Sequence, residues 1–267
     1  MKRELEKSLK RYLKRKIKVT LGLLVTFLIT GQVGYSLNLT MDEYNNEQNV
    51  IINDNYIKNN ENTNYQYILG VIFDSSVEIN SKEINIVNNS NGDEVNRKEI
   101  STIVVSENSH LKLGNEETEN INLKVNTDKG VATGIAMYNL DEADRGGSLE
   151  INGKNFTLDV HANGEGSNKS TYGILVGTKP NKDGENCIVD INSENTVINV
   201  TNDSGLSYTA NALTAWGGGT IRLNSGNVKI DTNKNNVINV KRNSTVEINK
   251  YSLDKVIQLD GSIVFEC

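Results

Sequence analysis

The six residues SSVEIN (75–80) decide the fold, because the chain repeats their pattern at intervals of 25 to 40 residues. The later copies are SHLKLG (109–114), GSLEIN (147–152), CIVDIN (187–192), GTIRLN (219–224) and STVEIN (244–249), and GSIVFEC (261–267) resembles them again. In the first copy Val77 and Ile79 flank the charged Glu78, and the next five copies keep this alternation. Because successive side chains of a strand point to opposite faces, each copy predicts a strand with two buried residues and one exposed residue.

Two further kinds of short apolar segment accompany this phrase. One kind comprises EINIV (83–87), INLKV (121–125), FTLDV (156–160), TVINV (196–200), and then either NVKI (227–230) or NVINV (236–240). The other kind is led by Gly or Ala and comprises GVIF (70–73), GIAM (134–137), GILV (173–176) and NALTAW (211–216). The three kinds recur largely in one order, with the Gly- or Ala-led segment first and SSVEIN second.

Three short strands with three turns need about two dozen residues, which is one turn of a three-sided parallel β-helix. A β-sandwich also uses many short strands, but it does not require each strand to resemble the one three before it. The sequence therefore predicts an all-β protein whose residues 66–267 form a right-handed parallel β-helix of roughly six rungs, after an N-terminal signal helix.

One position closes the repeated strand in every copy. It is occupied by Asn80, Gly114, Asn152, Asn192, Asn224 and Asn249. Asn and Gly accept a left-handed backbone at a corner, so we predict that conformation at this position. Stacked Asn side chains also form hydrogen bonds along a column, as in cross-β stacks.

The N-terminus has the three regions of a secretory signal. Residues 1–18 carry nine Lys and Arg against two Glu, VTLGLLVTFLIT (19–30) is uncharged, and GQVGYS (31–36) ends in small residues. The apolar run is shorter than the roughly 20 residues that cross a bilayer, so a cleaved signal peptide is favoured over an anchor. We predict cleavage between Ser36 and Leu37, with N-terminal sequencing of exported protein beginning close to Leu37. Residues 37–65 are polar and rich in Asn, which predicts a linker or an ill-ordered cap.

Charge and composition exclude several classes of function. The chain carries 28 Lys and Arg against 34 Asp and Glu, so removal of residues 1–36 leaves 19 against 32 and a net charge of −13. Such a chain repels the phosphates of nucleic acids. Its two cysteines make no disulfide framework, and we expect Cys187 to be buried and Cys267 to be incidental. With two histidines and no CxxC or HExxH, the sequence predicts neither a metal site nor a cofactor.

The basic signal MKRELEKSLKRYLKRKIKVTLGLLVTFLITG resembles the extended signal region of autotransporters, the type V secretion proteins, from low-GC diderm anaerobes. The repeats YGILV, CIVDIN and TVINV are similar to those of adhesin-type autotransporter passengers, which are parallel β-helices. The resemblance implies a non-enzymatic, surface-exposed module that travels through the outer membrane and binds a receptor or glycan on a host or neighbouring cell. The translocator barrel of that family is missing from this chain, so we expect a truncated passenger segment.

Three groups of residues offer alternatives with chemistry. NDSGLS (202–207) is close to the GDSG of trypsin-like proteases, with Ser204 as nucleophile and His110 or His161 as base, although Asn202 stands where the oxyanion hole needs Gly. NKDGEN (181–186) and DEADRGG (141–147) place carboxylates beside Gly, but neither matches a calcium loop. The exposed middle residues of the phrase form a charged column, namely Glu78, Lys112, Glu150, Asp190, Arg222 and Glu247.

The charged column supplies the main alternative function. Parallel β-helices that cleave polysaccharides, as lyases or glycosidases, mount carboxylates on such a face, and hydrolysis needs two carboxyl groups roughly 5–9.5 Å apart. Charged residues are equally typical of an ordinary solvated face, where neighbours of opposite sign offset one another. The sequence therefore favours the adhesin, assigns no catalytic, cofactor or metal residue, and keeps an exported polysaccharide-cleaving enzyme as the alternative.

Overall fold

A computed structural model of the chain describes residues 41–61, 66–90, 99–128, 131–138, 146–163, 171–177, 187–203, 209–249 and 256–266. The predicted signal peptide with its cleavage site at Ser36 and Leu37 lies outside these ranges, as do Ser204, the loop 181–186 and Cys267. Within the described ranges, no helix has the length and hydropathy needed to span a membrane.

The repeated phrase forms one stack of parallel strands, which we call column 2. Its members are β2 (Val50–Ile52), β5 (Ser76–Ile79), β8 (His110–Leu113), the start of β11 (Ser148–Ala162), the start of β13 (Ile188–Asn202), β15 (Thr220–Leu223) and β17 (Thr245–Ile248). The strands pair in register, so that Val77 lies beside Leu111, which lies beside Leu149. Stacking in register places equivalent residues of successive copies about 4.8 Å apart.

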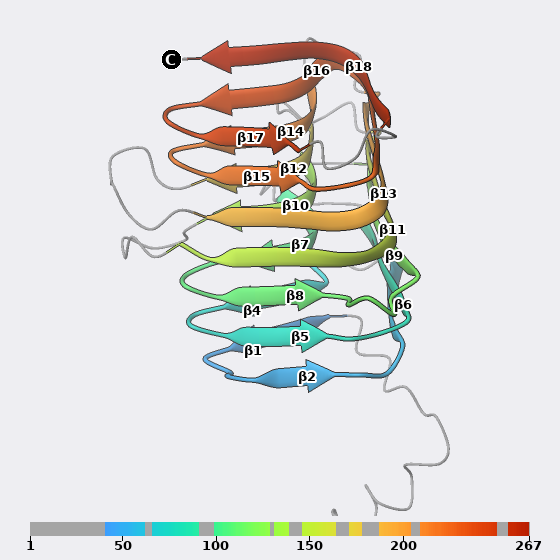
Figure 1. Ribbon diagram of the computed structural model, residues 1–267, viewed down its shortest axis with the longest axis vertical. Coiled ribbons are helices and arrows are strands. Elements are labelled where there is room, and N and C mark those ends of the chain that lie inside the picture. The colour runs from blue at the N-terminus through green and yellow to red at the C-terminus, as the bar shows by residue number, and fades with distance from the viewer. Residues whose placement is uncertain are drawn as a thin grey trace, which may run out of the picture. The chain divides into compact units, whose positions relative to one another are not determined.

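Two further stacks complete the sheet. Column 3 contains β3 (Tyr56–Glu61), β6 (Glu83–Ser90), β9 (Asn120–Thr127), the ends of β11 and β13, and the starts of β16 (Asn227–Lys241) and β18 (Val256–Glu266). Column 1 contains β1 (Asp42–Asn45), β4 (Leu69–Ile72), β7 (Glu99–Val105), β10 (Val131–Tyr138), β12 (Thr171–Gly177), β14 (Ala210–Trp216) and the ends of β16 and β18. The described strands thus form one curled, parallel, 18-stranded sheet (Figure 1), which confirms the all-β, β-helix-like prediction.

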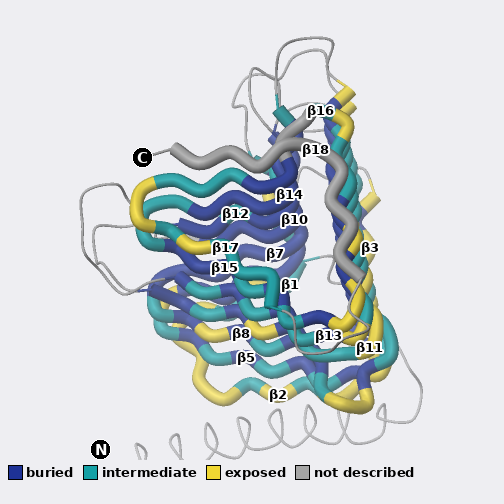
Figure 2. The backbone as a smooth tube through the Cα atoms, turned by 45° about the horizontal axis from the view of Figure 1, so that its top comes forward, coloured by how far each residue is buried: buried dark blue, intermediate teal, exposed yellow. Residues whose placement is uncertain are grey.

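The apolar side chains of all three columns meet in one core. In β5 of column 2 and β6 of column 3, buried residues alternate with more exposed ones, whereas β7 and β14 are buried along almost their whole length (Figure 2). Phe156 is the largest of the fully buried side chains. Each buried aliphatic or aromatic side chain stabilises the fold by about 1.5–3 kcal/mol. Cys187 lies in this core, as predicted, and burial raises the pKa of its thiol.

The structure corrects the prediction for residues 37–65. Instead of a linker, residues 42–61 form β1, β2 and β3, which pair with β4, β5 and β6. The polar composition is compatible with strands because Asp42 accepts hydrogen bonds from the Tyr56 hydroxyl at 2.7 Å and from Lys58 Nζ at 2.9 Å. Tyr56 is buried, and Lys58 lies 5.4 Å from the centre of its ring. This cluster joins column 1 to column 3 in the first layer of the sheet.

The structure also settles the positions after residue 225. NVKI (227–230) pairs with column 3 and NVINV (236–240) with column 1, so both segments are strands. GSIVFEC (261–267) does not continue column 2 as its resemblance to SSVEIN suggested. Residues 262–266 pair with the end of β16 and belong to column 1.

The tight corners of the fold lie between columns 1 and 2, where consecutive residues have positive φ. Examples are Glu107 (55°) with Asn108 (60°), and Gly217 (60°) with Gly218 (93°). The left-handed conformation predicted at the end of the repeated strand is therefore wrong for its five Asn residues, and only Gly114 has a positive φ there (78°). The corner between columns 2 and 3 is wider, and its Asn side chains have another role.

Candidate functional site

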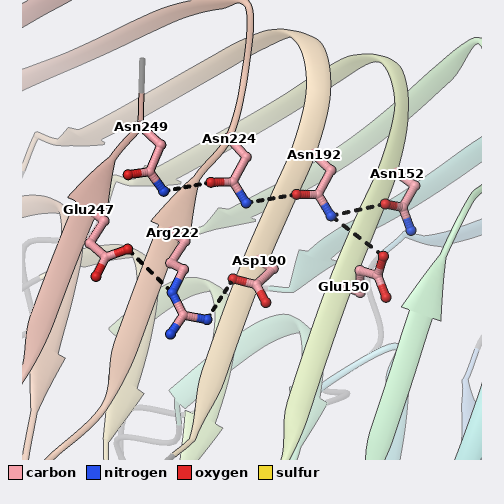
Figure 3. A network of polar contacts seen from close by, with 8 residues as sticks. All are labelled: Glu150, Asn152, Asp190, Asn192, Arg222, Asn224, Glu247 and Asn249. Carbon is pink, nitrogen blue, oxygen red and sulfur yellow. Dashed lines mark hydrogen bonds and ion pairs between the residues drawn. The ribbon is translucent and has the colours of Figure 1, made fainter. Parts of the chain in front are cut away.

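The charged outward residues of column 2 form two groups of ion pairs. Lys112 Nζ lies 3.0 Å from Glu78 Oε1. The Arg222 guanidinium lies 3.3 Å from both Asp190 and Glu247 (Figure 3). Register brings Glu150 between Lys112 and Asp190. The column therefore holds two carboxylates side by side, each next to a cation on its other side. Of the six residues in the charged column, all except Glu150 make an ion pair with a neighbour in that column.

Glu78 gives a prediction for the effect of pH. The hydrogen bond from Lys112, followed by one from Asn80, lowers the pKa of Glu78. A depressed pKa stabilises the fold above the unfolded-state value of about 4.3, and this contribution is lost as pH falls through the folded-state value. Both side chains are more than a third exposed, so the contribution is at most about 1 kcal/mol. We expect Glu78→Gln to lower the free energy of unfolding slightly at pH 7, and the difference from wild type to vanish at about pH 2, below both pKa values. Urea titrations at the two pH values measure this, and an equal difference at both would contradict it.

Asn side chains at the end of column 2 form a hydrogen-bonded ladder, as predicted. Asn249 donates to Asn224 at 2.7 Å, Asn224 to Asn192 at 2.8 Å, and Asn192 to Asn152 at 3.0 Å (Figure 3). Every Nδ2 points toward the copy that precedes it in the sequence. Aligned amides polarise one another, so the chain strengthens along its length.

A second ladder, which was not predicted from the sequence, lies at the start of column 3. Asn227 donates to Asn195 at 2.7 Å, Asn195 to Asn155 at 3.0 Å, and Asn155 to Asn120 at 3.0 Å, while Asn120 donates to Glu83. The two ladders flank the corner between columns 2 and 3. Their signal in the sequence is the spacing N-x-x-N at 152–155, 192–195 and 224–227.

A substitution in the middle of the first ladder measures how much the ladder contributes to the free energy of unfolding. Asn192→Ala removes the donor to Asn152 and the acceptor of Asn224 together, so two ladder bonds are lost in a partly buried corner. We expect a loss of about 1–3 kcal/mol in the free energy of unfolding. Asn249→Ala removes a single bond at the end of the ladder and should cost less. Equal losses in urea titrations of the two variants would show that the ladder is not cooperative.

A groove of about 430 Å³ opens at this corner, in the size range of small-molecule sites. It is lined by Lys112, Asn115, Glu116, Glu150, Asn152, Gly153, Lys154, Asn192 and Glu194. The groove forms because one corner between columns 2 and 3 contains more residues than the next. Six residues, 114–119, separate the paired positions Leu113 and Asn120, whereas three residues, 152–154, separate their partners in β11. The longer corner stands out from the sheet and forms one wall.

Hydrogen bonds hold this wall in place. The buried Thr118 hydroxyl donates to the Ser81 carbonyl at 2.7 Å and accepts from the backbone N–H of Asn115 at 3.0 Å. The Thr118 carbonyl accepts from the backbone N–H of Lys154 at 3.0 Å. Asn115 Oδ1 caps the turn by accepting from the N–H of Glu117. The groove is therefore preformed.

The proposed protease residues are only partly described. His110 lies in column 2 with Nδ1 2.7 Å from Ser148 Oγ, and His161 lies in column 3 with Nε2 2.7 Å from Asp203 Oδ2. Asn233 also donates to Asp203, at 2.9 Å. The two histidines are thus in different columns, and Ser204 lies outside the described residues. The described residues therefore include a His–Asp pair of the kind a serine protease uses, but not the proposed nucleophile.

The two candidate calcium loops are not tested by the structure, because residues 181–186 and 141–145 are outside the described ranges. In the parts of the chain that are described, no three His, Cys, Asp or Glu residues cluster as metal ligands. No model of a protein family, no curated protein and no solved structure matches this chain. Its function is therefore inferred from the geometry of columns 2 and 3 and of the groove between them.

Proposed function

We propose that the chain is a segment of an autotransporter passenger, exported and displayed at the cell surface, whose β-helix presents a non-enzymatic binding face. The helix is right-handed and extends from residue 42, with one rung for each copy of the repeated phrase and a further rung that contains β2. Its partners are receptors or glycans on a host or neighbouring cell. The continuous apolar core supports a stiff module of this kind, because each layer rests on the layer before it.

The observation that carries the proposal is the pairing of charges in column 2. Glycoside cleavage requires one carboxylic acid kept protonated by an apolar or like-charged surrounding. Asp190 is instead paired with Arg222, and Glu78 with Lys112. Glu150 is near the Lys112 ammonium and accepts a long hydrogen bond of 3.5 Å from Asn192. The hydrogen bond from Lys112 lowers the pKa of Glu78, which favours its ionised form, and Asp190 is held in an ion pair, as on an interaction surface.

One observation favours the alternative of a polysaccharide-cleaving enzyme. Glu150 and Asp190 are register partners on adjacent strands, and Glu150 lines the groove. Register partners on neighbouring parallel strands are about 4.8 Å apart. This strand spacing is close to the roughly 5–5.5 Å that separates the two carboxyl groups of a retaining glycosidase.

Product analysis separates the two functions. The purified chain is incubated with neutral and acidic polysaccharides, and new reducing ends and unsaturated ends are measured. We expect no release above buffer, and Glu150→Gln and Asp190→Asn should change stability by no more than about 0.5–1 kcal/mol. Release by wild type that either substitution abolishes, while the control Glu247→Gln keeps it, would replace the proposed binding role with catalysis.

A further inference from the structure

The first Asn ladder ends at the groove, and its last donor is free. The residue that precedes Asn152 in the column is Gly114, which has no side chain to accept a hydrogen bond. A Cβ atom at Gly114 would lie 2.1 Å from the backbone oxygen of Asn152, so no larger residue fits there. Among the described residues Asn152 Nδ2 therefore has no hydrogen-bond partner, although Asn152 Oδ1 accepts from Asn192. Figure 3 shows Asn152 at the end of the ladder, and Asn152 lines the groove, so the polarised chain of amides ends in an unpaired donor there.

The groove offers acceptors beside this donor. The Glu116 and Glu194 side chains line it and have no hydrogen-bond or ion-pair partner in the described part of the chain. The Glu150 carboxylate accepts the long hydrogen bond from Asn192 and lies near the Lys112 ammonium. Lys154 supplies a second donor and makes no ion pair with a described residue, while Lys112 is already bound to Glu78. The lining of one preformed groove thus contains both hydrogen-bond donors and carboxylate acceptors.

We infer that this groove binds a neutral hexose-containing glycan. A sugar hydroxyl donates one hydrogen bond and accepts others, so neighbouring hydroxyls satisfy a carboxylate and an amide at once. Hydrogen bonds to charged groups are the stronger kind, at about 1.5–3 kcal/mol each. The lining carries three carboxylates and two ammonium groups, one of them neutralised by Glu78, so an acidic glycan meets net repulsion. A neutral polyol uses both sets of groups without that cost.

The inference deepens the proposed binding role and rests on it, because a cleaving enzyme would consume the same ligand. The wall 114–119 and the end of the ladder are fixed before binding, which reduces the entropy lost when the ligand is held. Residues of the groove come from three successive copies of the phrase, so the site exists only where the long corner interrupts the repeat.

The test measures binding of the purified full chain to an array of neutral gluco-, manno- and galacto-oligosaccharides, with oligogalacturonates as the acidic comparison. Asn152→Ala and Asn249→Ala form a matched pair, since each removes one ladder bond and only the first faces the groove. Lys154→Ala and Lys229→Ala form a second pair. We expect at least one neutral oligosaccharide to bind the wild-type chain. Its affinity should be at least tenfold lower for the two groove variants, Asn152→Ala and Lys154→Ala. Its affinity for the two controls should be within twofold of the wild-type value.

Three outcomes overturn the inference. They are failure of every neutral oligosaccharide to bind, equal loss in the groove variants and their controls, and tighter binding of oligogalacturonates than of neutral chains. Attachment of the wild-type chain to cells is measured in parallel. Attachment that survives Asn152→Ala and Lys154→Ala overturns the groove inference and leaves the proposed function standing. Release of shorter sugars from a bound neutral chain overturns the proposed function itself.

Discussion

Ile191→Asp is expected to abolish the native fold at neutral pH. Ile191 is fully buried and lies in register with Ile151 on one side and Leu223 on the other. The substitution removes a buried aliphatic side chain, at about 2–5 kcal/mol, and places an unpaired carboxylate in the core, at about 3–5 kcal/mol more. This total reaches the 5–15 kcal/mol that stabilises a whole domain. Circular dichroism and size-exclusion chromatography should show loss of the folded species.

The matched control is the residue next to Ile191. Asp190 points outward, and Asp190→Asn removes only the long ion pair with Arg222. Its cost should stay below about 1 kcal/mol. A folded Ile191→Asp variant with an unchanged melting temperature would mean that the two faces of column 2 have been assigned the wrong way round.

Phe156→Ala is expected to have the next largest effect, at about 3–5 kcal/mol in the free energy of unfolding. Phe156 is the largest fully buried side chain, and its register partners are the smaller Ile121 and Thr196. Those two strands are hydrogen-bonded to β11 on either side, so they cannot move in to fill the cavity. Urea denaturation measures the loss.

Phe156→Leu serves as the control for this cavity. It keeps most of the apolar volume and should cost about 1.5 kcal/mol or less. Similar losses for the two variants would contradict the rigid stacking of the layers, because they would show that the core collapses around the smaller side chain.

The strands of columns 2 and 3 were predictable because one side of each faces the core and the other faces solvent. The resulting period of two is visible in SSVEIN (75–80) and EINIV (83–87). β7 (Glu99–Val105) lacks that signal, since Thr102 and Val104 are as buried as Ile103 and Val105. β1 and β3 escaped prediction for a different reason, as their polar side chains bond to one another through Asp42.

The candidate site was predictable only in part. A column of Asn residues at one position predicted the first ladder, because hydrogen-bonding side chains at equal register must stack. The groove was not predictable, since it depends on three additional residues in one corner and on the hydrogen bonds of Thr118. Neither feature has periodicity. The unpaired amide nitrogen of Asn152 follows from Gly114, and the repeat pattern in the sequence does not distinguish that Gly from the Asn residues at the same position.

In-register stacking of successive copies underlies the core, both ladders and the groove, and cysteine cross-linking tests it directly. Asp159 and Asn199 are 40 residues apart in the sequence and are register partners, and Asn199 Nδ2 donates to Asp159 Oδ1 at 2.7 Å. The register spacing of about 4.8 Å suits a disulfide, whose Cα atoms lie about 4.4–6.8 Å apart. In a Cys267→Ser background, Asp159→Cys with Asn199→Cys should form a disulfide under mild oxidation, as read by mass spectrometry of unreduced peptides. Asp159→Cys with Thr201→Cys, offset by two residues, should remain reduced; cross-linking of the offset pair in preference to the register pair would contradict the stacking.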